Sequence, residues 1–274
     1  MTPRSTGARL ALALALAAAT AAALSLAAAP ARADMLHAIY RVSLVGLPIG
    51  TAVLDADLSP SSYTIRADAR LTGLAKLFAN ARGASTGNGA IVEGRIAPAT
   101  FATTAASSQM TRTIRMALAG NAVTGVDIAP PFDEKPDRVP LGPNDEQNIV
   151  DPVGAAVIPA PASGAMAPPT ACNRKIPIFD GYTRFDIDLT YVGERSAKAK
   201  GYNGPVAVCA VRYVPISGHS PDRPATKFMA ENKDVEVWLA PIEADRVWMP
   251  FRVSVRTMIG TTVVEAQEFR VNGK

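Results

Sequence analysis

Apolar and polar residues alternate along most of the chain after residue 33. In residues 36–44, every second position from Leu36 to Leu44 is apolar. The same alternation recurs in residues 51–58, 63–71, 185–191, 235–239 and 247–255. A period of two is typical of antiparallel strands with one buried face. The pattern therefore predicts a mainly β protein with about ten to twelve strands. Pro250 cannot donate to a β-ladder, which predicts an edge position, a bulge or a strand start there.

Helix signals are few. Residues 73–80 hold enough apolar positions for two helical turns. Residues 144–157 predict a second helix, with Asn144 or Asp145 as its cap. Pro152 should keep that helix short or interrupted, because proline inside a helix removes a hydrogen bond. The sequence thus predicts one or two short helices.

Proline and alanine are concentrated in the middle of the chain. Tracts such as IAPPFDEKPDRVPLGP and PAPASGAMAPP are typical of loops or linkers. They could separate two domains near residue 160, but neither half alone holds enough predicted strands to close on itself. We therefore expect one β domain over residues 34–274, with a Pro/Ala-rich loop around residues 129–170.

The N-terminus has the order of features found in a secretory signal peptide. Arg4 and Arg9 precede an apolar run, residues 10–29, and the small-x-small site of residues 31–33 follows it. A retained membrane anchor is the alternative, since the run approaches the ~20 residues that span a bilayer. Cleavage before Asp34 is the favoured interpretation, with export to the periplasm. No later run is long and apolar enough to span a membrane.

The charge balance argues against nucleic-acid binding. The whole chain holds 28 basic and 24 acidic residues. Residues 1–33 contribute Arg4, Arg9 and Arg32 and no acidic residue, which leaves 25 basic and 24 acidic residues. Nucleic-acid binding requires a concentrated basic surface. We therefore expect no nucleic-acid partner.

Cys172 and Cys209 are the only cysteines. A zinc site normally needs four ligands, and only His37 and His219 could join them, without any short ligand spacing. In an exported chain two cysteines predict one disulfide. No phosphate-binding glycine loop or dinucleotide fingerprint is found either. We expect neither a metal nor a cofactor.

The stretch CNRKIPIFDGYTRFDIDL, residues 172–189, concentrates charged residues. Asp180-Gly181 between two apolar runs predicts a hairpin with a type I′ turn. Arg184, Asp186 and Asp188 follow at a spacing of two, which is typical of a solvated strand face. The structural interpretation of this stretch is favoured over a catalytic one.

A hydrolase-type site is the alternative, and it would be centred on Asp180, Asp186 and His219. Ser217 or Ser220 could supply a nucleophile beside His219. No G-x-S-x-G motif supports such a triad, and proximity in sequence does not establish its geometry.

Several motifs together resemble one family. They are VDPVGA, CNRKIPIFDGYTRFDIDL, YNGPVAVCAVRYVPISGH and EVWLAP, and the segments YRVSLVGLPIGTAVL and SYTIRADARLTGLAKLF resemble the opening of the same family. It is the exported bacterial domain-of-unknown-function family 3108. The resemblance implies a strongly curved antiparallel sheet or an open β-barrel. It has no activity to transfer. The matching positions are Asp151, Pro152, Cys172, Phe179, Asp180, Gly181, Arg184, Asp186, Cys209, Gly218 and His219.

The favoured functional hypothesis is a non-enzymatic periplasmic protein. It would bind an apolar or amphipathic small molecule or lipid, or support assembly of the cell envelope, since a curved sheet can enclose an apolar cavity. The alternatives are the hydrolase above and an interaction scaffold without a ligand. The sequence leaves the ligand and the oligomeric state open.

Overall fold

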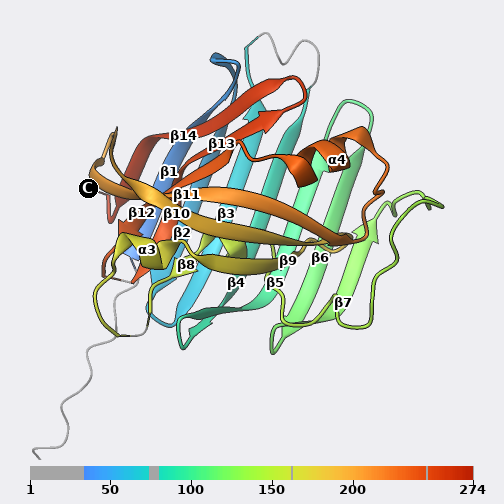
Figure 1. Cartoon of the computed structure of the whole chain (residues 1–274), viewed down its shortest axis with the longest axis horizontal. Coiled ribbons are helices and arrows are strands. Elements are labelled where there is room, and N and C mark those ends of the chain that lie inside the picture. The colour runs from blue at the N-terminus through green and yellow to red at the C-terminus, as the bar shows by residue number, and fades with distance from the viewer. Residues whose placement is uncertain (1–33, 74–79, 162, 245, 274) are drawn as a thin grey trace, which may run out of the picture. The chain divides into compact units, whose positions relative to one another are not determined.

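The computed structural model describes residues 34–73, 80–161, 163–244 and 246–273, and these residues are mostly strands (Figure 1). They belong to one compact unit that runs from residue 33 to residue 274. The first seven strands are β1 (Asp34–Leu44), β2 (Leu47–Ser59), β3 (Ser62–Leu71), β4 (Arg82–Val92), β5 (Arg95–Ala106), β6 (Thr111–Ala119) and β7 (Ala122–Ala129). The others are β8 (Ile158–Pro159), β9 (Arg174–Phe179), β10 (Arg184–Ala199), β11 (Tyr202–Ser217), β12 (Val235–Ile242), β13 (Val247–Thr257) and β14 (Gly260–Val271).

All strands join one antiparallel sheet. Its order is β7-β6-β5-β4-β3-β2-β1-β14-β13-β12-β11-β10-β9, and β8 pairs with β13 off this path. Neighbours in the sheet are therefore mostly neighbours in sequence, and the pair β1–β14 joins the two halves. The sheet does not close, because β7 and β9 are its two edges. The mainly β fold with an open antiparallel sheet, which the sequence predicted, is confirmed.

The predicted alternation is also seen in the core. Leu36, Ala38 and Tyr40 on β1 are buried, and the register places Leu36 beside Ala56 on β2 and Val271 on β14. Side chains at every second position point to the same face of a sheet, so these registers bring the apolar faces together. The largest fully buried side chains of this core include Tyr63, Phe179, Phe251 and Phe269.

Strands β11 to β13 are buried on both faces. Val206 and Met249 point into the main core, whereas their neighbours Ala207 and Trp248 belong to a second cluster. That second cluster also includes Ile158, Ala171 and Cys172, which come from the mid-chain loop and its end. Burial on both faces explains why β11 reads as a continuous apolar run, VAVCAV, instead of an alternating one.

The helices differ from the predicted ones in place. Residues 144–157 contain turns, isolated bridges and the 3-10 helix η1 (Gly154–Ala156), so the helix predicted there is wrong. Within the described residues, the α-helices are α3 (Pro168–Ala171) and α4 (Pro224–Glu231), each with proline in its first turn. Of the helix predicted at residues 73–80, positions 74–79 lie outside the described residues. In the described ranges, no helix combines the length and the apolar character that a membrane span requires.

The part of the chain that the structure describes holds fourteen strands, against about ten to twelve predicted, and one of them is the two-residue β8. Pro250 lies inside β13, opposite Leu239, where the register between β12 and β13 shifts. A bulge was one of the three positions predicted for this proline, and the structure selects it.

Candidate functional site

Residues 138–151, which we call the closing segment, connect the two edges of the open sheet. On the β7 side, the Val123 amide donates to the Glu146 carbonyl at 2.9 Å, and the Ile149 amide donates to the Asn121 carbonyl at 3.0 Å. On the β9 side, the Val150 amide donates to the Pro177 carbonyl at 2.9 Å, and the Phe179 amide donates to the Val150 carbonyl at 3.1 Å. These bonds satisfy backbone groups that a helix would have paired internally, which explains the missing helix.

Arg138 fastens the start of the closing segment. Its Nε donates to the Gly218 carbonyl at 3.1 Å and its Nη2 to the Tyr182 carbonyl at 2.6 Å. The guanidinium also lies over the Tyr182 ring, 4.0 Å from the centroid. The backbone of Val139 exchanges hydrogen bonds with Gly218 and His219. The predicted positions Gly218 and His219 therefore contact the closing segment through their main chain.

Asp151 ends the closing segment inside the core, with no exposed surface. Its Oδ1 accepts hydrogen bonds from the Val153 and Gly154 amides, each at 2.9 Å, and its Oδ2 lies 3.5 Å from the Tyr63 hydroxyl. Burial raises the pKa of this carboxyl, and the two amide bonds oppose that rise. Gly87 and Gly154 leave room for the carboxyl, since an added Cβ would lie 3.1 Å from Oδ1 or 2.7 Å from Oδ2.

The loop of residues 180–183 joins β9 to β10. Phe179 pairs with Arg184, so the loop holds four residues, and positive φ occurs at Gly181 (94°) but not at Asp180. The hairpin is confirmed, but the predicted two-residue type I′ turn is wrong because that turn needs positive φ at both central residues. Asp180 Oδ1 accepts from the Tyr182 and Thr183 amides at 2.9 and 2.6 Å, and its Oδ2 accepts from the Thr183 hydroxyl at 2.6 Å.

The charged residues at the start of β10 form a half-buried network. Arg184 lies 2.6 Å from Asp186, and Lys175 lies 3.1 Å from Asp186 and 3.3 Å from Asp188. The Asp186 side chain is only 9% exposed, so the solvated face predicted for it is wrong. Near this network, the Ser217 hydroxyl, the Gly142 amide and the Arg184 charge lower the pKa of Asp145 in the closing segment.

The hydrolase hypothesis required Asp180, Asp186 and His219 to converge. Asp180 is committed to its own loop, and Asp186 is committed to Arg184 and Lys175. Among the described residues no hydrogen bond or ion pair joins His219 to either carboxylate, and its buried Nδ1 has no partner there. An acid–base site needs the base held by an orienting group. The described ranges also contain no group of three His, Cys, Asp or Glu residues that could hold a metal ion.

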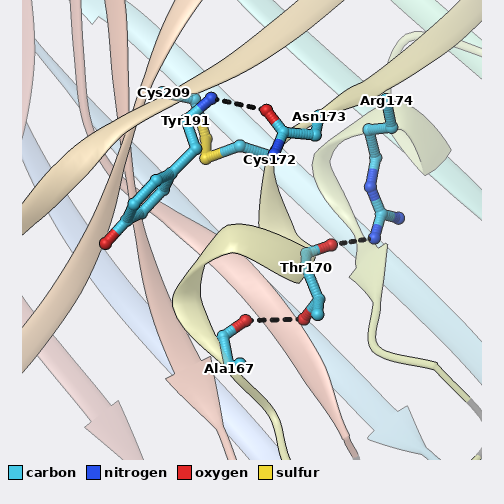
Figure 2. Close-up of a disulfide and its surroundings, with 7 residues drawn as sticks. All are labelled: Ala167, Thr170, Cys172, Asn173, Arg174, Tyr191 and Cys209. Carbon is cyan, nitrogen blue, oxygen red and sulfur yellow. Dashed lines mark hydrogen bonds between the residues drawn. A yellow bond between two sulfur atoms is a disulfide. The ribbon is translucent and has the colours of Figure 1, made fainter.

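Cys172 and Cys209 form a disulfide, as predicted (Figure 2). Their Cα atoms are 5.6 Å apart, within the range of roughly 4.4–6.8 Å that a disulfide allows. Cys172 follows α3, and Cys209 lies within β11 opposite Tyr191. Asn173 continues this attachment, because its Oδ1 accepts from the Tyr191 amide at 2.9 Å. The bond ties the end of the mid-chain loop to the sheet.

A pocket of about 690 Å³ lies beside the closing segment. Its apolar walls include Ile96 on β5, Val157 and Ile158 after η1, and Ile176 on β9. Its polar lining is Arg95, Asn121, Asn148, Arg174 and Lys175. None of the seven residues predicted as functional outside the disulfide lines this pocket.

The sequence analysis did not predict the polar residues of the pocket as functional, for two reasons. Arg174 and Lys175 stand in the stretch 172–189, but the sequence alone does not show that they face the β4–β5 hairpin. Asn121 lies in the β6–β7 turn and Arg95 begins β5 directly after the β4–β5 turn, and polar residues are ordinary at such positions. The pocket is assembled from segments far apart in sequence, so no local spacing could have identified it.

Comparison with known proteins defines the family and the fold. No curated protein matches the chain by sequence. The family described as "Protein of unknown function (DUF3108)" matches residues 39–267. The chain is similar to the solved "Beta-barrel-like Protein of Domain of Unknown Function DUF1849 from Brucella abortus", at 9% identity and a TM-score of 0.53, over 88% of this chain and 98% of that one. A solved structure from Parabacteroides distasonis ATCC 8503 is 9% identical, with a TM-score of 0.33, over 87% and 96% of the two chains. At such identity, the likeness to the Brucella protein concerns the fold alone.

Proposed function

The chain belongs to the family of proteins of unknown function DUF3108, and we propose that it is an exported binding protein for an amphipathic small molecule with an anionic end. The proposal rests on one observation: Arg174, a partly buried cation, forms part of the wall of an otherwise mostly apolar pocket and has no carboxylate partner among the described residues.

The pocket has the size and lining of a small-molecule site. Such sites typically measure about 300–1,000 Å³ and have apolar walls with a few polar groups. The walls formed by Ile96, Val157 and Ile176 suit a hydrocarbon body. The Asn148 side-chain amide and the Arg174 guanidinium can donate hydrogen bonds to an acceptor or an anionic group at one end of the ligand.

The three cations of the pocket differ in what they already bind. Lys175 pairs with Asp186 and Asp188, and Arg95 lies 3.7 Å from Glu93. Arg174 donates instead to two backbone carbonyls, those of Pro159 and Thr170. Burial lowers the pKa of Arg174, yet guanidinium stays charged at neutral pH. An anionic group beside it would therefore gain more than one beside an already paired cation.

Export is supported by two features of the chain. Residues 1–33 have the order of a signal peptide. Cys172 and Cys209 are bonded, which suits an oxidising compartment such as the periplasm. Ligand delivery within the cell envelope would fit both features.

Binding of a fluorescent fatty-acid analogue, 11-(dansylamino)undecanoate, tests the proposal. We expect saturable one-to-one binding, weakened about tenfold by Arg174→Gln because a charge-assisted hydrogen bond is lost. The uncharged analogue 11-(dansylamino)undecanol should bind Arg174→Gln and the unchanged protein about equally.

Arg112→Gln is the matched control. Arg112 also donates to two backbone carbonyls, those of Pro130 and Pro131, at 2.9 and 3.1 Å, but it does not line the pocket. Equal weakening by both variants, or no saturable binding together with no small molecule co-purifying in mass spectrometry, would refute the proposal.

A further inference from the structure

The tips of two adjacent hairpins carry exposed aliphatic side chains. Val45 and Leu47 lie at the β1–β2 turn, and Met258 and Ile259 at the β13–β14 turn. These two hairpins lie at the same end of the sheet (Figure 1). Their exposed fractions are 66%, 70%, 60% and 75%. β1 and β14 pair directly, and the Val45 amide donates to the Thr261 carbonyl at 2.9 Å, so the four residues form one patch.

The opposite end of these strands is polar. The β2–β3 turn reads SPSS, and the β4–β5 turn carries Glu93 and Arg95. The β12–β13 connection contains Glu243 and Arg246. Val92 is exposed at the polar end too, but it stands beside Glu93 and Arg95. Within the described ranges, adjacent turns that both carry large exposed aliphatic residues are therefore a feature of one end, and folding gains nothing from leaving such residues in water.

Charge is distributed unevenly behind the apolar tips. Arg41 is exposed on β1, Arg70 is exposed on β3 where it pairs with Thr51, and Arg256 is exposed on β13. Arg256 lies 3.4 Å from Asp234, whereas Arg41 and Arg70 take part in no ion pair among the described residues. Along β1 and β2 the first acidic residues from the tips are Asp34 and Asp55, and β13 has none. On β14 Glu265 lies opposite Arg41, and on β3 Asp68 is two residues from Arg70.

We propose that these hairpin tips, Val45, Leu47, Met258 and Ile259, insert into the surface of a lipid bilayer that contains anionic lipids. Interfacial binding combines apolar side chains buried ~5–10 Å deep with cations at the headgroup level. Arg41 is four residues from Val45, about 13 Å at the rise of a strand, and arginine side chains extend towards the headgroups. The tips thus reach the acyl boundary while the arginines meet phosphate groups.

The shape of the patch favours a bilayer over a protein partner. The four side chains protrude from convex turns, and a bilayer deforms around such tips, whereas a protein would need a matching cavity. Among the described residues of this end, basic side chains outnumber acidic ones: Arg41, Arg70, Arg82, Arg252 and Arg256 stand against Asp68, Asp234 and Glu265. A net positive charge of this kind suits an anionic surface. This inference does not depend on the pocket, which is lined by residues around the β4–β5 turn, the closing segment and β9 and by none of the four tip residues.

Flotation with vesicles tests the inference. The protein used begins at Asp34, because residues 10–29 would bind lipid by themselves, and it keeps all fourteen strands and the disulfide. It should float with vesicles of phosphatidylcholine and phosphatidylglycerol in a 3:1 ratio. Leu47→Ser/Ile259→Ser should lower the partition coefficient at least about tenfold, since each residue loses the burial of an aliphatic side chain.

The matched control is Met35→Ser/Val92→Ser. Met35 and Val92 are also exposed, 63% and 53%, but they lie at the polar end, so their replacement should leave flotation unchanged. Arg41→Ser/Arg70→Ser should weaken binding to the anionic vesicles and have little effect with pure phosphatidylcholine. Thermal melting checks that every variant folds.

Three results would overturn the inference. They are failure of the unchanged protein to float with anionic vesicles, equal flotation of the tip variant, and equal loss in the tip and control variants. Sedimentation adds a further decision: a dimer that dissociates in the tip variant and does not bind vesicles would assign the patch to a second copy of the chain.

Discussion

The hairpins of β1–β7 and the loops around the closing segment hold their strands by different means. At the β6–β7 turn, Gly120 has φ of 58°, and an added Cβ would meet nothing within 4 Å. Gly218, with φ of 79°, lies against the Tyr182 carbonyl, and Gly181 lies against Ile114 on β6. The first kind of turn needs only its own backbone geometry, whereas the second also needs space for a distant segment. Sequence motifs are therefore concentrated where local pairing alone cannot bring the sheet edges together.

Gly218→Val tests this difference most strongly. The valine would adopt an unfavourable φ and its Cβ would collide with the Tyr182 carbonyl and with Thr183 Cα, 2.8 Å away. We expect a loss of more than about 4 kcal/mol in the free energy of unfolding, or failure to fold. Urea titration of purified protein measures it. Gly120→Val is the control, with only backbone strain of about 1–2 kcal/mol. Equal losses in the two variants would show that space at Gly218 is unimportant.

Removal of the disulfide should have the next largest effect. Cys172→Ala/Cys209→Ala opens a loop with a sequence separation of 37, for which the entropy of loop closure gives about 3–4 kcal/mol. Unfolding in urea should move to lower concentration in this variant. Reductant should shift the unchanged protein to the same degree and leave the variant unaffected. A shift with reductant in the variant would contradict this assignment.

The buried carboxyl of Asp151, at the end of the closing segment, should make the stability of the protein depend on pH. Because burial raises its pKa, the folded protein holds the proton at pH values where the unfolded chain has released it. Stability from this group is present below the unfolded pKa, near 4, and is lost as pH rises through the folded pKa, by at most about 1.4 kcal/mol per pH unit.

Asp151→Asn should remove that slope. Asparagine keeps an acceptor for the Val153 and Gly154 amides without a charge to bury. The variant should therefore equal or exceed the unchanged protein in stability above pH 6. Urea unfolding of the variant and of the unchanged protein at pH 4, 6 and 8 measures this difference in stability. A steeper slope in the variant, or a loss above about 2 kcal/mol at pH 8, would argue that the ionised carboxylate stabilises the fold.

The sequence predicted those features that depend on local pattern. Alternation at Leu36, Ala38 and Tyr40 placed β1 correctly, and the two cysteines predicted their bond. Residues 144–157 were predicted as a helix because their composition permits one, whereas the bonds from Ile149 and Val150 to both sheet edges decide their structure.

The pocket shows the same limit. Arg95, Asn121 and Arg174 come from three separated segments, and only the folded sheet brings them together. Asp186 was predicted to lie on a solvated strand face, because the spacing of residues does not show which side chains surround a strand. Its environment depends on Arg184 beside it on β10 and on Lys175, which reaches it from β9.

Asp180→Asn should give the smallest effect and separates structure from chemistry in the 180–183 loop. Asparagine retains the Oδ1 acceptor for the Tyr182 and Thr183 amides and changes only the contact with the Thr183 hydroxyl. We therefore expect a change of less than about 1 kcal/mol in unfolding free energy, whereas Asp180→Ala, which leaves both amides without this acceptor, should cost about 1–2 kcal/mol. Binding of 11-(dansylamino)undecanoate should be unchanged in both variants, because Asp180 does not line the pocket. Loss of binding in Asp180→Asn at unchanged stability would instead assign this carboxylate a direct functional role, since its turn would still be intact.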